Sequence, residues 1–248
     1  MLNFEKPIYK ITEYVENKNY GKFELEPLER GFGTTLGNSL RRIMLSSMPG
    51  SAIVAVKIDG VMHEFQTMDG IVEDVTTIIL NLKNVVVKNN SPEVQIVKLD
   101  SDKEGVVTAA DIEANSDVEI ISKDQEIATI AKGGKLDMEL IIANGRGYVP
   151  STDNKSFVEN EKKGFIPIDA LYSPIERVSY EVESARVGQD ANYDKLIMEV
   201  FTNGSLRPEE AMALAAKIMI EHLNIVTNLS EISDITGIMN AKQEDSKL

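Results

Sequence analysis

Residues 28–50 read LERGFGTTLGNSLRRIMLSSMPG, a stretch that contains both the start and the end of a helix. Two glycines, Gly31 and Gly33, loosen the backbone ahead of the helix, and Thr34 or Thr35 is expected to cap its first turn. The closing Pro-Gly pair ends the helix, because proline cannot continue it. The stretch therefore predicts one helix of about four turns.

This helix has two faces of different character. One apolar stripe recurs at helical spacing and predicts a buried face made of Leu36, Leu40, Ile43 and Ser47. The other face carries Asn38, Arg41, Arg42 and Leu45. A leucine beside two arginines is typical of a protein interface, where arginine flanks apolar anchors. The alternative is a solvated arginine pair with one stray leucine.

A second helix with two faces is predicted near the end of the chain, from Pro208 to about Thr227. Its first apolar stripe contains Ala211, Leu214, Ala215, Ile218, His222, Ile225 and Leu229, and its second contains Met212, Ala216, Met219, Leu223 and Val226. A helix that is apolar over more than half its circumference must bury two faces. One face can cover its own sheet, and a symmetric dimer would bury the other. The alternative is a helix enclosed within one domain.

The rest of the chain reads as strands with one further helix, which predicts an α+β fold. Apolar periodicity predicts a helix over residues 69–82. Short β-rich runs separated by turn residues follow from 85 to about 168, with no long helix among them. Alternating patterns predict further strands over residues 8–15, 23–25, 54–58, 178–182 and 196–200.

Composition limits the classes of function. The 248 residues suit one or two domains, and the net charge of −14 argues against a broad surface for nucleic acid. There is no apolar run near twenty residues, and the first residues lack the apolar centre of a signal peptide. The sequence has no cysteine, so disulfides and thiolate metal sites are excluded. These features fit a cytoplasmic protein.

No constellation of catalytic residues is evident, and neither a metal nor a cofactor is expected. Gly31, Gly33 and Gly37 follow a strand and open a helix, which is the setting of a phosphate-binding loop. Their spacing fits neither the dinucleotide fingerprint nor the Walker pattern, so close packing of the helix is the alternative. His63 and His222 are far apart, and His222 falls on an apolar stripe typical of a packed core residue. A single glycine-rich turn at 145–147, followed by Tyr148, is weak evidence for RNA binding, and a β-turn with a packed tyrosine is the alternative.

The opening stretch is similar to the first helix of the bacterial RNA polymerase alpha subunit, in the N-terminal part that drives assembly. Further segments match that family in the same order, and the resemblance covers the chain up to about Leu229. They are AVKIDGVMHEF from Ala55, DGIVEDVTTIILNL from Asp69, VTAADI from Val107, GRGYVP from Gly145, LYSPIERVSYEVESARVGQ from Leu171, YDKLIMEVFTNGS from Tyr193 and PEEAMALAAKIMIEHL from Pro208.

The resemblance implies how the domains are arranged. Residues 1–50 and 170–229 would form a discontinuous dimerisation domain of antiparallel sheet plus two helices. Residues 51–169 would be a β-rich domain inserted into it, and residues 230–248 a disordered linker or tail. Family members usually continue into a small C-terminal domain that binds promoter DNA. This chain stops inside what resembles the linker, so direct DNA binding is not expected of it.

The resemblance also implies the partners, which are a second copy of the chain and the polymerase β and β′ subunits. The implied β-facing residues are Asn38, Arg41, Arg42, Leu45, His63, Glu64, Thr67, Asp69, Glu73 and Asp74. The implied β′-facing residues are Lys83, Ser173, Pro174, Glu176 and Arg177. The dimer interface would comprise Phe32, Leu36, Leu40, Ile43, Met212, Ala216, Met219, Leu223 and Val226. Two alternatives are a nucleotide-binding enzyme using the Gly31–Gly37 loop and a stand-alone nucleic-acid-binding module.

Overall fold

The computed structural model describes residues 8–15, 19–159 and 164–227. The chain divides into two compact units. Unit 1 comprises Met1–Leu45, Ile175–Thr202 and Leu206–Leu248, and unit 2 comprises Ser46–Pro174 and Asn203–Ser205. Unit 1 is therefore built from segments that are far apart in the sequence. The predicted tail, 230–248, lies outside the described residues.

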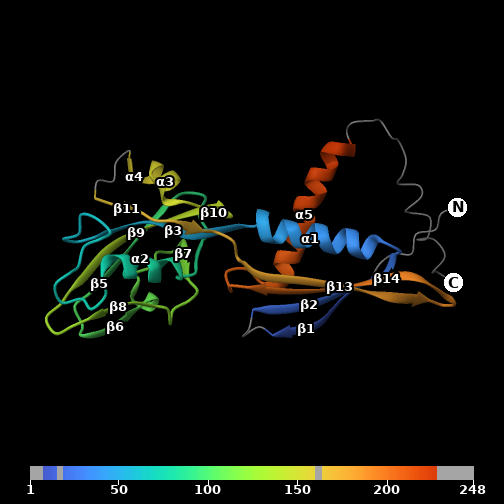
Figure 1. The fold of residues 1–248 in the computed structure, drawn as a ribbon, viewed down its shortest axis with the longest axis horizontal. Helices are drawn as coiled ribbons and strands as arrows, with labels where there is room; N and C mark the ends of the chain where they lie inside the picture. The colour runs from blue at the N-terminus through green and yellow to red at the C-terminus, as the bar shows by residue number, and fades with distance from the viewer. Residues whose placement is uncertain (1–7, 16–18, 160–163, 228–248) are drawn as a thin grey trace. The chain divides into compact units, whose positions relative to one another are not determined.

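Unit 1 is built on a four-stranded antiparallel sheet with the strand order β1-β2-β14-β13 (Figure 1). The central pair, β2 and β14, joins strands from opposite ends of the chain. Hairpin partners flank this pair on both sides, with β1 on β2 and β13 on β14. The strands are β1 (Ile8–Val15), β2 (Tyr20–Glu29), β13 (Ile175–Val187) and β14 (Asp190–Thr202).

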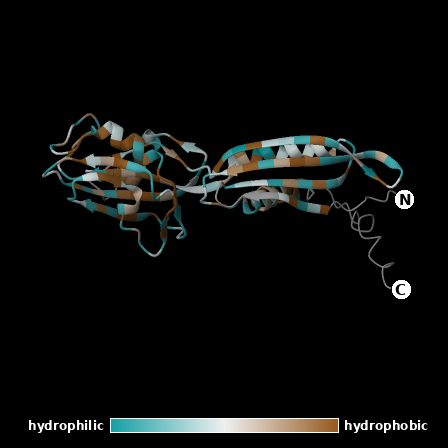
Figure 2. Cartoon of the chain, turned by 90° about the horizontal axis from the view of Figure 1, so that it is seen from below, coloured by the Kyte–Doolittle hydropathy of each residue, from teal (hydrophilic) through white to brown (hydrophobic). Residues whose placement is uncertain are grey.

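Two helices, α1 (Phe32–Ser47) and α5 (Pro208–Thr227), cover one face of this sheet. A Cβ added to Gly37 of α1 would lie 2.8 Å from Leu196 on β14. One added to Gly21 of β2, opposite Val200 in the register, would lie 2.9 Å from Pro208 of α5. Since Leu196 and Val200 share a face of β14, both helices lie on that face. Figure 2 shows hydrophilic and hydrophobic residues alternating along these strands.

Two glycines of helix α1 lie against the sheet. Hydrophobic periodicity does not detect them, because glycine has no apolar side chain. The buried residues of α1 are Gly33, Gly37, Leu40 and Met44. Of the predicted stripe, Leu40 alone is fully buried, while Leu36, Ile43 and Ser47 are half-buried. The prediction placed the buried face at the wrong angle about the helix axis. The close approach of the glycines to the sheet turns the buried face toward Met44.

The start of α1 is capped by a residue that is distant in the sequence, and not by the threonines of the helix itself. The Asp194 carboxylate of β14 accepts hydrogen bonds from the amide nitrogens of Gly31, at 2.8 Å, and Gly33, at 3.1 Å. Thr34 and Thr35 lie inside the helix, and the Thr35 hydroxyl donates back to the Gly31 carbonyl oxygen at 3.1 Å. The predicted threonine cap was therefore wrong. Asp194 supplies the negative charge that a helix N-terminus favours.

Unit 2 is a β-rich unit around a four-stranded sheet with the order β11-β3-β9-β5. Two-stranded pairs β4-β7, β6-β8 and β10-β12 surround it. One core of buried aliphatic side chains joins the sheet, the pairs β4-β7 and β6-β8, and α2. A second cluster includes Ala170 of β12, with Val149 of β10 packed against it. The elements are β3 (Pro49–Ile58), α2 (Val75–Lys83), β4 (Val87–Asn89), β5 (Gln95–Ser101), β6 (Gly105–Thr108), η2 (Ala109–Asp111), β7 (Val118–Ile120), β8 (Glu126–Ile130), β9 (Leu136–Arg146), β10 (Tyr148–Val149), α3 (Ser151–Asn154), α4 (Ser156–Glu159), β11 (Ile166–Pro167) and β12 (Ala170–Leu171).

Helix α2 is shorter than its sequence pattern predicts. It begins at Val75, and Asp74 caps it by accepting a hydrogen bond from the amide of Thr77 at 2.7 Å. The preceding residues pair with β8, since Ile71 forms a bridge with Ile130 and the Val72 amide donates to the Thr129 carbonyl oxygen. Residues 69–74, predicted as the first turns of this helix, are therefore a connection with a turn at 69–70, a bridge at Ile71 and bends at 72–73.

The α+β fold predicted from the sequence is confirmed, with antiparallel sheets and few helices. The last helix, α5, runs from Pro208 to Thr227 as its apolar pattern predicts. Among the residues that the structure describes, no helix is long and apolar enough to cross a membrane.

Candidate interaction surfaces

The solvent face of α1 gathers the four residues predicted from its second pattern. Asn38, Arg41, Arg42 and Leu45 are all exposed, and they recur at helical spacing on one side of α1. Arg41 also has a role inside unit 1, because its Nε donates to the Val178 carbonyl oxygen at 3.2 Å. Val178 belongs to β13, an edge strand, so Arg41 covers part of an open sheet edge.

A second exposed surface lies on the connection before α2. The predicted residues His63, Glu64, Thr67 and Asp69 are exposed there. Three apolar neighbours that sequence analysis did not single out are also exposed, Met62 at 89%, Phe65 at 79% and Val72 at 69%. The helical periodicity of residues 69–82 had assigned Val72 to a buried face.

Internal hydrogen bonds hold this connection in place. Gln66 accepts from the Met62 amide at 2.8 Å and donates to the Gly60 carbonyl oxygen at 3.2 Å. The Thr76 hydroxyl donates to the Glu64 carbonyl oxygen at 2.7 Å. The exposed apolar side chains are thus carried by an ordered backbone, which reduces the entropy lost on binding.

The last two predicted β-facing residues, Glu73 and Asp74, are engaged within the chain. The Glu73 carboxylate accepts from both the amide and the hydroxyl of Thr129, at 2.6 and 2.9 Å. Asp74 caps α2, and the hydrogen bonds from Thr77 lower the pKa of its carboxyl. Their geometry indicates that both carboxylates shape the connection.

The predicted β′-facing residues are divided between the two units. In unit 2, Lys83 forms an ion pair with Asp169, Ser173 is half-buried and Pro174 is buried. In unit 1, Glu176 and Arg177 are exposed, and the Arg177 guanidinium lies 4.0 Å from the centre of the Phe201 ring. Pro174 is consequently not available for direct contact in this conformation.

The predicted dimer residues of α5 pass from buried to exposed along the helix. Met212 is buried in its own chain, Ala216 and Met219 are half-buried, and Leu223 and Val226 are exposed at 53% and 59%. The predicted set does not include two further exposed apolar residues of the same segment. They are Ile220, with an exposed fraction of 54%, and Ile225, with 68%.

On α1, the predicted dimer residues likewise differ in exposure. Phe32 is 50% exposed, Leu36 and Ile43 are half-buried, and Leu40 is buried at 5%. Leu40 therefore belongs to the core of unit 1, as Met212 does. Both residues were selected by apolar spacing. Such spacing does not distinguish a helix face that packs on its own sheet from one that packs on a partner chain.

The geometry of the glycine loop contradicts the nucleotide-binding alternative. The amides of Gly31 and Gly33, which would have to face a phosphate, already donate to the Asp194 carboxylate. A phosphate would meet that negative charge. A Cβ on Gly33 would lie 2.7 Å from Val182, and one on Gly37 would lie 2.6 Å from the Tyr180 ring. These glycines serve close packing of α1 on the sheet.

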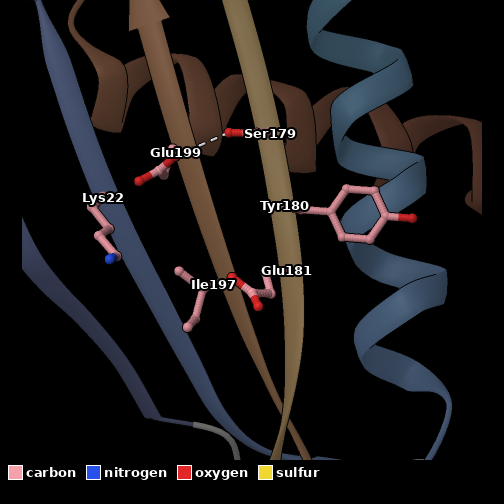
Figure 3. Close-up of a pocket in the computed structure, with 6 residues that line it drawn as sticks. All are labelled: Lys22, Ser179, Tyr180, Glu181, Ile197 and Glu199. Atoms are coloured by element: carbon pink, nitrogen blue, oxygen red, sulfur yellow. Dashed lines mark hydrogen bonds between the residues drawn. The ribbon is translucent and has the colours of Figure 1, made fainter.

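A hollow on the opposite face of the unit 1 sheet does not resemble a ligand site. It has a volume of about 150 Å³ and is lined by Lys22, Ser179, Tyr180, Glu181, Ile197 and Glu199 (Figure 3). Ligand pockets commonly have roughly 300–1,000 Å³. The Glu199 carboxylate already accepts from the hydroxyls of Ser179 and Tyr20, each at 3.1 Å.

Two smaller predictions differ from the structure. His222 is exposed, and its Nδ1 lies 2.8 Å from the Ile218 carbonyl oxygen, so it is not a core residue. Tyr148 follows a turn at Gly147, where φ is +63°, but its side chain is 63% exposed and not packed. Over residues 8–15, 19–159 and 164–227, no group of three or more His, Asp or Glu side chains is arranged to hold a metal ion.

The family model of the RNA polymerase Rpb3/RpoA insert domain matches residues 56–173 of this chain. That match falls within unit 2 and defines the class of protein, a polymerase subunit with an inserted domain.

Comparison with related proteins identifies the family to which the chain belongs. DNA-directed RNA polymerase subunit alpha of Oceanobacillus iheyensis is 53% identical over 247 residues, covering 100% of this chain and 78% of the relative. The proteins with that name from Carboxydothermus hydrogenoformans and Symbiobacterium thermophilum are 52% and 51% identical, with the same coverage. The chain belongs to the family of bacterial RNA polymerase alpha subunits, and it takes part in transcription within the polymerase complex.

Proposed function

We propose that this subunit is a non-catalytic scaffold of the polymerase. Two copies pair, and the pair then docks the β and β′ subunits through surfaces that are chemically identical on both copies. The observation that carries the proposal is the apolar surface left exposed on the second half of α5, at Ile220, Leu223, Ile225 and Val226.

Burial of this surface requires a second chain or another subunit. Four large apolar side chains within seven residues exceed the scattered single exposures that are normal for a soluble surface. The first half of the same helix covers its own sheet through Ala211, Met212 and Ala215. A symmetric pairing through α5, with Phe32 and the half-buried Leu36 and Ile43 of α1, buries the remaining apolar face.

The proposed β-facing residues occur in each unit, on the solvent face of α1 in unit 1 and on the connection before α2 in unit 2. Arg42 and Leu45 supply the arginine and apolar types that are enriched at interfaces. Met62, Phe65 and Val72 add apolar anchors, while Glu73 and Asp74 hold the connection that carries them. The proposed β′-facing residues are Lys83 and Ser173 in unit 2 and, separately, Glu176 and Arg177 in unit 1.

The chain is proposed to contribute no catalytic group to RNA synthesis and no direct contact with promoter DNA. The net charge of −14 disfavours a phosphate-binding surface. The proposal also puts this role in the cytoplasm, in keeping with a sequence that contains no cysteine.

The proposal is tested by co-expressing the tagged chain with the β and β′ subunits of its source and purifying on the tag. Both large subunits are expected to co-purify with two copies of the tagged chain. Recovery of the chain alone, at an expression level where all three proteins are soluble, would refute the docking role.

A further inference from the structure

Helix α5 carries a histidine on the face that its first half uses for packing. At about 100° per residue, Ala211, Ala215 and His222 lie within roughly 40° of one another around the helix axis. Both alanines are fully buried, whereas His222 is exposed. Figure 1 shows the reason, since the C-terminal half of α5 projects beyond α1 and the strands of unit 1. The face that packs in unit 1 at the start of α5 therefore continues into solvent at His222.

The neighbours of His222 on this face are apolar. Ile218 and Met219 come one turn before it and are half-buried. Ile225 and Val226 come one turn after it, with exposed fractions of 68% and 59%. Within residues 218–226, all of which the structure describes, His222 is the only titratable side chain on this face. It therefore lies at the centre of the apolar surface through which α5 is proposed to pair.

The charged groups of the two pairing helices lie away from His222. On α5, Glu221 and Lys217 are turned from it by about 100° and 140° around the helix axis. On α1, Arg41 and Arg42 are turned by about 120° or more from the face proposed for pairing. Among the residues that the structure describes, neither pairing face thus offers a carboxylate that would stabilise a charged imidazole.

Hydrogen bonding identifies the atom of His222 that takes up a proton. Its Nδ1 lies 2.8 Å from the Ile218 carbonyl oxygen, which can only accept, so Nδ1 carries the hydrogen of the neutral ring. Proton uptake then falls on Nε2 and gives the ring a full positive charge. Burying that charge among apolar side chains is far more costly than burying the neutral ring.

We propose that His222 makes the pairing of two chains sensitive to pH, because the interface accepts the neutral ring and excludes the charged one. This inference rests on the pairing proposed above and adds a regulation of the same interface. Two separate chains take up protons that the pair does not, so pairing weakens as the pH falls. Histidine is suited to this role, since its side chain changes charge between pH 5 and 8.

The size of the effect follows from the number of rings. Imidazole in model peptides has a pKa of about 6.5, so at pH 5.5 the charged form outweighs the neutral form about tenfold. A pair that requires the neutral ring from each copy is then weakened about tenfold per copy. The expected loss of pairing affinity between pH 8 and pH 5.5 is therefore roughly 100-fold.

Fluorescence-detected sedimentation of the labelled chain, from nanomolar to micromolar concentration and from pH 8 to pH 5.5, measures the dissociation constant of the pair. His222→Gln replaces the ring by a polar side chain that does not titrate, and it should remove the pH dependence. His63→Gln is the matched control, because His63 is the other histidine of the sequence, and this variant should keep the loss seen in the unaltered chain.

His222→Lys introduces a charge that persists at pH 8, so this variant should pair as weakly at pH 8 as the unaltered chain does at pH 5.5. Because His222 is exposed in the single chain, all three variants should keep the circular dichroism spectrum of the unaltered chain. Full pairing of His222→Lys at pH 8 would overturn the inference.

Two further results would also contradict it. One is a pair whose dissociation constant does not change between pH 8 and pH 5.5, including a pair that stays intact at every concentration. The other is an equal loss of affinity in His222→Gln. If the unaltered chain sediments at the single mass even at pH 8, the proposed pairing itself fails, and this result is distinct from a pair that ignores pH.

Discussion

Several exposed side chains on these surfaces also make contacts inside the chain. Arg41 and Arg42 are adjacent on α1 and both are exposed. Arg41 donates to a carbonyl oxygen of an edge strand, so it contributes to the fold of unit 1. Glu73 and Asp74 likewise bind inside unit 2. The family resemblance implied one role for all four.

Arg42→Ala is expected to weaken binding to β more than it weakens folding. Truncating an arginine in a desolvated interface costs about 2–5 kcal/mol, which corresponds to tens- to thousands-fold in affinity. The same truncation on an exposed helix face changes folding stability by about 0.5 kcal/mol or less. Titration of purified β against the variant, with its melting curve alongside, measures both quantities.

Arg41→Ala provides the matched comparison. It leaves the Val178 carbonyl oxygen without its side-chain donor, so about 1 kcal/mol of folding stability should be lost in addition to any loss of binding. Equal binding of β by the unaltered chain and by Arg42→Ala would remove Arg42 from the interface. A lower melting temperature for Arg42→Ala than for Arg41→Ala would reverse the two roles.

The lowered pKa of the Asp169 carboxyl predicts that the folding stability of the chain depends on pH. The pKa of this carboxyl falls from 3.8 to about 2 in the folded chain, chiefly through the hydrogen bond from Lys83. The folded state therefore binds the proton less readily than the unfolded state. The stabilisation is complete above about pH 5 and is lost as the pH falls toward 2, and screening at a partly exposed pair keeps it near 1 kcal/mol.

Urea denaturation of the unaltered chain and of Asp169→Asn, at a series of pH values from 6 to about 2, measures this effect. The difference in unfolding free energy between the two proteins should be constant above pH 5 and should shrink toward pH 2. A difference that does not change over this range would contradict the assignment.

At the scale of elements, sequence patterns located most helices and strands but not how closely they pack. The bounds of α5 and the alternation in β13 and β14 follow from proline, glycine and apolar spacing. The buried face of α1 could not be read in this way, since Gly33 and Gly37 carry no hydrophobic signal. The start of α2 was misplaced because Ile71 and Val72 continue its helical period while pairing with β8.

The interaction surfaces were predictable only in part, for a related reason. The exposed polar residues of α1 and of the connection before α2 were found, whereas Met62 and Phe65 were not. An apolar residue in a sequence predicts burial unless a structure shows that nothing covers it. The tethering of Lys83 by Asp169 joins residues 86 positions apart and has no local signal.

Gly37→Ala tests the close packing of α1 on its sheet. The new methyl group would lie 2.6 Å from the Tyr180 ring and 2.8 Å from Leu196, so the helix must move outward. Overpacking of this kind costs about 1–3 kcal/mol, against which the gain in helix propensity from glycine to alanine is roughly 1 kcal/mol. A net loss of stability is expected in urea denaturation.

Thr34→Ala is the control, because it also introduces an alanine, at an exposed position of the same helix. It should leave the unfolding free energy unchanged or slightly raised. If Gly37→Ala were as stable as Thr34→Ala, the helix would not be held close to the sheet by its glycines.

The proposed pairing is a property of the whole molecule. The first half of α5 is buried in its own unit, and its second half exposes four large apolar side chains. Leu223→Glu puts a charge into the proposed interface, where burial without a partner is costly. Since Leu223 is 53% exposed in the single chain, the variant should keep its fold and lose the dimer. Asn224→Glu adds the same residue on the polar side and should leave the dimer intact.

Sedimentation velocity at micromolar concentration tests the central claim most directly, because docking of two large subunits by identical surfaces requires a pair of chains. The chain is predicted to sediment with twice its mass of 27.4 kDa, and Leu223→Glu with the single mass. Sedimentation of the unaltered chain at the single mass would contradict the account, since α5 would then leave its apolar surface uncovered without a second copy.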